Sequence, residues 1–256
     1  MQKRKKTTLS KLYIITFLFF AANLLAKAQI PSGVYMDTVT NNGSKQIHQV
    51  KIHNGYFIYN EYEIEPANFI KTLGGFTEVQ HSGSKNELVV RLEFNSDYEK
   101  DSVKIVSIPF KMDGKNLQLN WFRNLTLKPI ISTAQDLDGA YLFATRGPDK
   151  GQERRGEESS RKTLKLLMDN TFQWVAYDTN SFRFSGTGGG SYSAKDGIYK
   201  ENIAFFSKDN SRVGAQLEFK YELEGADWHH TGNNSKGEPM YEIWSQRPSN
   251  SNKSSN

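Results

Sequence analysis

The sequence predicts an all-β protein made of two tandem small antiparallel barrels. Apolar and polar residues alternate along residues 217–224, a period of two that is typical of half-buried strands. Turn pairs such as Asn54-Gly55 and Asp169-Asn170 favour tight hairpins. The pattern of the first half of the chain recurs in the second, and no stretch has the period of an amphipathic helix. A single larger barrel or a β-sandwich is the alternative architecture.

The first 28 residues are predicted to be an export signal. A basic stretch precedes an apolar run of about 14 residues, Leu12 to Leu25, and Ala26-Lys27-Ala28 supplies the small residues that a signal peptidase recognises. An uncleaved anchor is the alternative, but a helix needs roughly 20 apolar residues to span a bilayer. We therefore expect cleavage near Ala28 and a secreted or periplasmic protein with no transmembrane anchor.

The charge of the chain changes meaning once this segment is set aside. The 33 basic and 28 acidic residues give a net charge of +5, but six basic residues and no acidic ones lie within residues 1–28. Without those six, 27 basic residues remain against 28 acidic ones, so we expect no nucleic-acid partner. The chain has no cysteine, which excludes disulfides, a thiol nucleophile and cysteine-ligated metals. An exported domain without disulfides is more typical of bacteria.

An internal duplication divides the rest of the chain. Residues 52–59 align with residues 167–174 at a shift of 115. The same shift aligns further landmarks of the two copies, namely Phe69 with Phe184, Gly74-Gly75 with Gly189-Gly190, and Leu88 with Ile203. The period is too long for a solenoid repeat. We therefore predict two homologous domains, at residues 30–128 and 136–248.

The second copy carries an insertion near its start. Gly33-Val34-Tyr35 matches Gly139-Ala140-Tyr141 at a shift of only 106, so about nine extra residues precede residue 167. Residues 147–161 are polar and charged, and we expect them to form a mobile loop. Residues 249–256 contain no apolar residue and are expected to be a disordered tail.

The ends of the copies resemble a known family. Each copy opens with Gly-x-Tyr, and the second closes with Glu242-x-Trp244-x-x-Arg247. This frame is similar to the calycin pattern of lipocalins and fatty-acid-binding proteins, and residues 163–247 resemble an uncharacterised lipocalin-like domain family of secreted bacterial proteins. The resemblance implies that Tyr141 takes the place of the family's tryptophan, that Arg247 covers it, and that Gly139 lets the chain enter close to the barrel base. A barrel of about eight strands either fills itself with side chains or holds one small ligand.

Aromatic residues of the second copy are the candidate ligand-binding residues. They line an apolar pocket if they face inward, and they form an ordinary core otherwise. Phe172 and Trp174 share one strand face while Val175 and Tyr177 share the other, so one set must lie outside the core or at a domain interface. The candidates are Phe172, Trp174, Phe184, Tyr192, Phe205, Trp228 and Trp244.

Three other kinds of site are considered. The glycine run 186–190 lacks the ending of a phosphate loop and a following helix, so close packing between strands is favoured. Neighbouring His229 and His230 point to opposite faces of a strand, cannot share one metal ion, and are expected to be exposed turn residues. Glu201 and Glu242 could pair as the acids of a hydrolase, but no nucleophile elbow accompanies them. We expect no metal, no cofactor and no enzymatic activity.

The leading functional hypothesis is a non-enzymatic lipocalin-like protein whose second domain binds a small apolar or amphipathic ligand. One alternative is an envelope interaction or glycan-binding module with filled barrels, whose partner is a glycan or another envelope protein. The other is an uncharacterised hydrolase. A cavity in the second barrel would favour the first hypothesis, coplanar exposed aromatics the second, and two carboxylates converging in a cleft the third.

Overall fold

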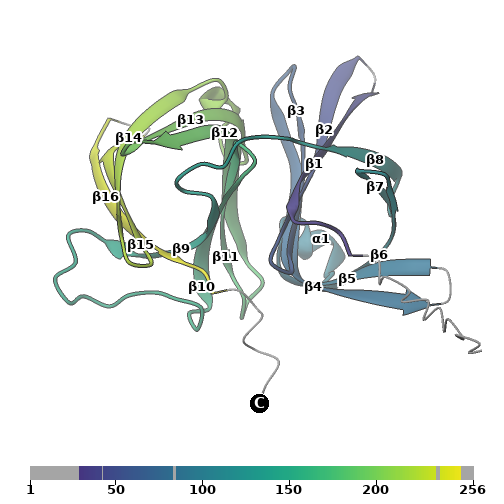
Figure 1. Ribbon diagram of the computed structural model, residues 1–256, viewed down its shortest axis with the longest axis horizontal. Coiled ribbons are helices and arrows are strands. Elements are labelled where there is room, and N and C mark those ends of the chain that lie inside the picture. Colours follow the sequence, from purple (N-terminus) through teal and green to yellow (C-terminus); the bar gives the residue numbers. More distant parts are fainter. Residues whose placement is uncertain (1–28, 42, 83–84, 235–236, 249–256) are drawn as a thin grey trace, which may run out of the picture.

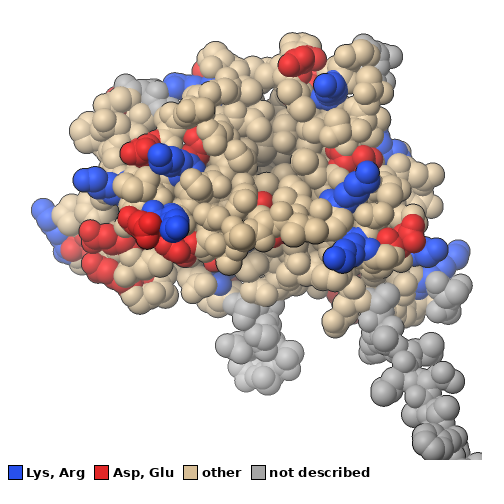
Figure 2. All heavy atoms as spheres, turned by 45° about the horizontal axis from the view of Figure 1, so that its top comes forward, with Lys and Arg blue, Asp and Glu red and all other residues tan. Residues whose placement is uncertain are grey.

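The computed structural model describes residues 29–41, 43–82, 85–234 and 237–248. The predicted export signal and the predicted disordered tail therefore lie outside the described residues. Within the described part of the chain, no helix has the length and apolar character needed to cross a membrane. On the face shown in Figure 2, basic and acidic side chains are interspersed.

Two closed antiparallel barrels of eight strands each follow one another along the chain (Figure 1). The first consists of β1 (Gly33–Asn41), β2 (Ser44–His53), β3 (Tyr56–Glu63), β4 (Asn68–Ser82), β5 (Lys85–Asn95), β6 (Ile105–Asp113), β7 (Asn116–Asn120) and β8 (Asn124–Pro129), with the short helix α1 (Tyr98–Asp101) before β6. The second consists of β9 (Gly139–Arg146), β10 (Arg161–Met168), β11 (Thr171–Asp178), β12 (Phe184–Lys195), β13 (Ile198–Phe206), β14 (Gln216–Glu224), β15 (Asp227–Asn233) and β16 (Pro239–Gln246), with the 3₁₀ turn η1 (Asn210–Arg212) before β14.

Each barrel is an up-and-down meander in which every strand pairs with its neighbours in sequence. The first strand closes on the last, β1 on β8 and β9 on β16. This confirms the predicted fold class of two tandem barrels and excludes the single larger barrel and the sandwich. The architecture is consistent with a lipocalin-like fold.

A glycine pair produces the same irregularity in both barrels. The pairing of β4 with β5 slips between Gly74 and Gly75, and the pairing of β12 with β13 slips between Gly189 and Gly190. A Cβ atom on Gly75 or on Gly190 would lie only 1.9 Å from a carbonyl oxygen of the facing strand. The glycine cluster therefore serves close strand packing, as the sequence predicts.

The strand register corrects one part of the sequence alignment. Gly75 lies opposite Leu92, and its counterpart Gly190 lies opposite Ile203. Leu92 is therefore the counterpart of Ile203, and the alignment of Leu88 with Ile203 is wrong. The error arises because the β4–β5 hairpin is two residues longer on each strand than the β12–β13 hairpin.

The barrels pack against each other through faces related by approximate two-fold symmetry. Phe69 stacks on its own counterpart Phe184, with ring centroids 6.3 Å apart. Tyr62 and Phe94 of the first barrel correspond to Tyr177 and Phe205 of the second. Each tyrosine packs on the phenylalanine of the other barrel, with ring centroids 4.8 Å apart for Tyr62 and Phe205 and 5.1 Å apart for Tyr177 and Phe94. Such reciprocal pairs are typical of the interface of a symmetric dimer. Val175 and Tyr177 belong to this interface, as the strand alternation requires.

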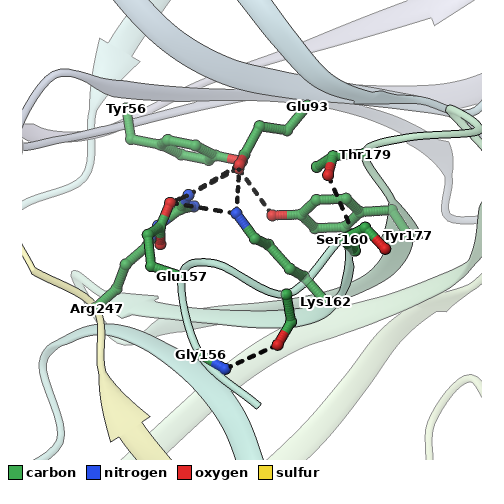
Figure 3. Close-up of polar contacts among 10 residues, drawn as sticks. Tyr56, Glu93, Gly156, Glu157, Ser160, Lys162, Tyr177, Thr179 and Arg247 are labelled. Atoms are coloured by element: carbon green, nitrogen blue, oxygen red, sulfur yellow. Dashed lines mark hydrogen bonds and ion pairs between the residues drawn. The ribbon is translucent and has the colours of Figure 1, made fainter.

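A buried carboxylate fastens the interface (Figure 3). Glu93 of β5 accepts hydrogen bonds of 2.8 Å from the phenols of Tyr56 and Tyr177. The ammonium of Lys162 and the guanidinium of Arg247, both from the second domain, lie 3.0 and 2.9 Å from its oxygens. Burial alone would raise the pKa of Glu93, but the two cations and the two phenols together hold it below its ordinary value.

Candidate functional site

The interiors of the two barrels differ in polarity at four equivalent positions. The strand registers show which positions of the two barrels are equivalent. Val50 corresponds to Lys165, Val90 to Glu201, Leu119 to His230 and Leu125 to Glu242. The four aliphatic residues belong to the buried core of the first barrel. Their four ionisable counterparts line one cavity in the second. The first barrel also buries ionisable side chains, but its His48 and Glu61 contact the Tyr59 phenol at 2.7 and 2.8 Å. Because burying ionisable groups costs stability, four of them around one cavity indicate a role beyond folding.

The cavity in the second barrel has a volume of about 260 Å³. Its walls are mostly apolar and include Trp174, Ile203, Phe206, Ala215, Leu217, Phe219, Met240 and Trp244. The volume is near the lower limit of ordinary small-molecule sites, and an apolar wall with few polar groups is typical of them.

The corresponding end of the first barrel is filled. Tyr59, the counterpart of Trp174, packs edge-to-face on Trp121 and on Phe122, with centroids 5.5 Å away in each case. The ammonium of Lys71 lies 3.8 Å from the centre of the Phe122 ring. Aromatic side chains therefore occupy in the first barrel the region that is open in the second.

Lys165 and Glu201 form a buried ion pair within the second barrel. The ammonium lies 2.9 Å from a Glu201 oxygen, and the phenol of Tyr199 donates a 2.7 Å hydrogen bond to the same oxygen. Burial and the Glu201 carboxylate raise the pKa of Tyr199 well above its ordinary value, so the phenol remains a donor. The aromatic rings within 6 Å of the ammonium belong to Phe172, Tyr199, Trp228 and Trp244. Each partner of this pair is therefore well compensated.

His230 and Glu242 differ from that pair because the histidine is not satisfied. Its Nδ1 lies 3.8 Å from a Glu242 oxygen, too far for a hydrogen bond, and both ring nitrogens are buried without a partner. Burial lowers the pKa of His230 despite the nearby carboxylate. Burial would raise the pKa of Glu242, but the neighbouring His230 and the charge of Lys165 hold it below its ordinary value. A neutral imidazole and an ionised carboxylate thus face the cavity together.

The predicted ligand-binding residues separate into three groups. Trp174 and Trp244 line the cavity. Phe172, Tyr192 and Trp228 belong to the core of the same barrel, where the phenol of Tyr192 donates to Asp138. Phe184 and Phe205 pack on the first domain, so their assignment to the pocket is wrong.

The slip at Gly189 and Gly190 explains the error for Phe205. It inserts one extra residue into β13, which reverses the alternation beyond Ile203. Phe205 therefore points to the first domain, and the neighbouring Phe206 lines the cavity. An insertion of this kind has no signature in the alternation pattern itself.

The expected closure of the barrel base also needs correction. Gly139 opens β9 with a φ of +149°. A Cβ atom added to Gly139 would lie 3.4 Å from the ring of Tyr141. Tyr141 points into the barrel and packs on Trp228, with centroids 5.4 Å apart. Arg247, however, lies over the rings of Tyr56 and Phe76 of the first domain, because the chain leaves β16 along the interface.

The histidine pair is not in a turn. His229 and His230 lie within β15, and His230 is only 2% exposed, so the expectation of exposed turn residues is wrong. The two side chains do point to opposite faces. Among the residues that the structure describes, no group of three or more histidine, aspartate or glutamate side chains is placed to hold a metal ion.

Comparison with known proteins gives no match to a family model and none to a curated protein. The contrast between the two copies within this chain therefore carries the functional argument.

We expect His230→Leu, which installs the residue type of the first barrel, to raise the free energy of unfolding by about 1–3 kcal/mol. The gain should grow as the pH falls through about 6.5, because unfolded His230 binds a proton there and the folded residue, with its lowered pKa, does not. Urea denaturation at several pH values measures both effects. The reciprocal Leu119→His should destabilise the first barrel. A His230→Leu protein with no gain at any pH would show that the imidazole is satisfied in solution.

Proposed function

We propose that the second barrel binds a small amphipathic molecule. Its apolar part lies against Trp174, Phe206 and Met240, and its polar group meets His230 and Glu242. The observation that carries this proposal is the replacement of four core aliphatic positions of the first barrel by ionisable residues around one cavity. We further propose that the protein belongs to the calycin superfamily as a non-enzymatic, lipocalin-like protein and that it acts outside the cytoplasm after removal of residues 1–28.

The polar end of the cavity defines the ligand group that would fit. Glu242 accepts a 3.0 Å hydrogen bond from the indole of Trp244 and retains acceptor capacity. His230 offers one donor and one acceptor, neither of which is used. A hydroxyl or an amine can donate to Glu242 and pair with the imidazole at the same time. A ligand with such a group would satisfy the buried atoms that the fold leaves unpaired.

The two carboxylates in the cavity raise the alternative of a hydrolase. Glycoside hydrolysis uses one protonated carboxyl as the acid and a second, ionised one as base or nucleophile. Glu201 is held by the Lys165 ammonium and the Tyr199 phenol, and the pKa of Glu242 is lowered rather than raised. Glu242 is therefore not placed to act as the acid near neutral pH, and one Glu201 oxygen is already engaged by two donors, which supports binding over hydrolysis.

A neutral fluorescent probe, N-phenylnaphthylamine, tests the proposal. We expect saturable binding to the wild-type protein, with energy transfer from Trp174 and Trp244. Ala215→Phe fills the cavity from its wall and should weaken binding at least about tenfold, a loss of about 1.4 kcal/mol or more. Ala226→Phe, at the exposed turn between β14 and β15, is the matched control and should bind as wild type does.

Two results would contradict the proposal. One is a wild-type protein that shows no saturable binding of this probe or of hydroxylated analogues of it. The other is an Ala215→Phe protein that is folded by circular dichroism and binds with unchanged affinity, since the probe would then occupy some other surface.

A further inference from the structure

In the second barrel, the pairing of β9 with β10 stops short of the end of β9. In the first barrel, the equivalent strands β1 and β2 pair without interruption from Gly33 to the turn at Asn41 and Ser44. In the second, the pairing of β9 with β10 ends at Leu142 and Leu164, although β9 continues to Arg146 in contact with β16. The insertion at residues 147–160 fills the connection. The two strands therefore separate at the cavity end of the barrel.

A hollow of about 490 Å³ lies at this separation. Its lining shares Thr163, Glu242 and Trp244 with the interior cavity. The shared residues place the two spaces on either side of the same short stretch of wall. The outer hollow and the interior cavity are therefore adjacent at these three side chains.

Three arginines surround the outer hollow, Arg146 at the end of β9, Arg155 in the insertion and Arg161 at the start of β10. Among the residues that the structure describes, none of the three guanidinium groups forms an ion pair. Glu153 and Glu242 are the carboxylates of the lining, so the cations are in excess. We call these three residues the arginine portal.

The insertion that supplies Arg155 is fixed in place rather than free. The Arg155 amide donates to the Ala144 carbonyl at 2.8 Å, and its guanidinium lies 5.4 Å from the Phe143 ring centre. The ring of Phe143 in turn packs on Trp244, with centroids 5.6 Å apart. Arg154 holds the loop to Asp227 by a 2.7 Å ion pair. The expected mobile loop is thus tied to the barrel, and Arg155 is held against Phe143, which packs on the cavity-lining Trp244.

We propose that the arginine portal binds the anionic group of the ligand, so that the ligand class is an amphipathic organic anion. Its carboxylate, sulfonate or sulfate lies among Arg146, Arg155 and Arg161, and its apolar part lies in the barrel. The planar guanidinium fork can direct two N–H groups at two oxygens of such an anion and form charge-assisted hydrogen bonds with them. This inference rests on the proposed function and specifies its ligand.

A matched pair of probes tests the charge requirement. Anilinonaphthalene sulfonate has the ring system of N-phenylnaphthylamine with an added sulfonate. In the triple variant Arg146→Gln, Arg155→Gln and Arg161→Gln, we expect the dissociation constant of the sulfonate to rise at least about tenfold, the effect of losing one charge-assisted hydrogen bond or more. The dissociation constant of the neutral probe should change less than about twofold. Raising the salt from about 0.01 to about 1 M should weaken only the sulfonate, because the Debye length falls from about 30 to about 3 Å.

The control variant removes three positive charges from the first barrel instead, with Arg91→Gln, Lys111→Gln and Lys128→Gln, all exposed. It should leave the dissociation constants of both probes within about twofold of their wild-type values, because exposed charges far from the bound probe are largely screened by salt. If the neutral probe binds in the barrel but the portal variant and the control affect the sulfonate equally, the portal is wrong and the proposed function stands. If Ala215→Phe weakens the binding of neither probe, the proposed function itself fails.

Discussion

Glu93→Gln is expected to lower the free energy of unfolding by about 3 kcal/mol. The substitution keeps the shape of the side chain but leaves Lys162 and Arg247 in the interface without its charge. Removing one partner of a buried ion pair typically costs about 3–5 kcal/mol, and the lower end applies because Glu157 still lies 3.2 and 2.8 Å from the same two cations. Urea denaturation monitored by tryptophan fluorescence measures the change.

The control for this prediction is Glu218→Gln, which removes the carboxylate that lies 3.0 Å from the Lys200 ammonium. This ion pair is on the surface, with the Glu218 side chain 61% and the Lys200 side chain 57% exposed. Exposed pairs contribute about 0–1 kcal/mol, so this variant should be close to wild type. Equal and small effects of both substitutions would show that the Glu93 cluster does not hold the barrels together.

The pH dependence of the Glu93 effect follows from its lowered pKa. A carboxyl with a lowered folded pKa stabilises the protein above the unfolded value, about 4.3, and this stabilisation is lost as the pH falls through the folded value. The difference between wild type and Glu93→Gln should therefore shrink below about pH 4. A difference that stays constant down to pH 3 would assign the effect to packing rather than charge.

The barrels themselves could be predicted from the sequence because their determinants are local. Alternation along residues 217–224 and the hairpin at Asp169-Asn170 each depend on a few neighbouring residues, and the duplication repeats them at a fixed shift. The interface cluster could not be predicted in this way. Glu93 and Arg247 are 154 residues apart, and neither lies in a pattern that marks it as buried.

The site could be predicted only in part, because inward-facing charges break the rule by which strand faces are assigned. The sequence presents Glu201 and Glu242 only as candidate acids of a hydrolase, and it predicts His230 in an exposed turn. Aligning Leu119 with His230 would have revealed the contrast between the copies, but that alignment needs the true lengths of the β4–β5 and β12–β13 hairpins. Hairpin length is set by pairing across the sheet, which the alternation pattern does not encode.

Lys165→Met is expected to lower the free energy of unfolding by about 3–5 kcal/mol, because it leaves the Glu201 carboxylate charged inside the barrel. Adding Glu201→Leu removes that charge but orphans the Tyr199 phenol, which loses its acceptor. Adding Tyr199→Phe as well removes the last unpaired group. The first barrel places Val50, Val90 and Leu88 at these three positions, so the fold accepts an apolar set there.

The triple variant Lys165→Met, Glu201→Leu and Tyr199→Phe should therefore match or exceed the stability of wild type, since apolar replacement of a buried ion pair is often neutral or stabilising by about 1–4 kcal/mol. Urea denaturation of the single, double and triple variants measures the series. Recovery in the triple variant would mean that the ion pair is not required for the fold. Its presence in the second barrel alone would then have to be explained by what the cavity binds, whereas a triple variant as unstable as Lys165→Met would make the pair part of the core and remove it from the ligand site.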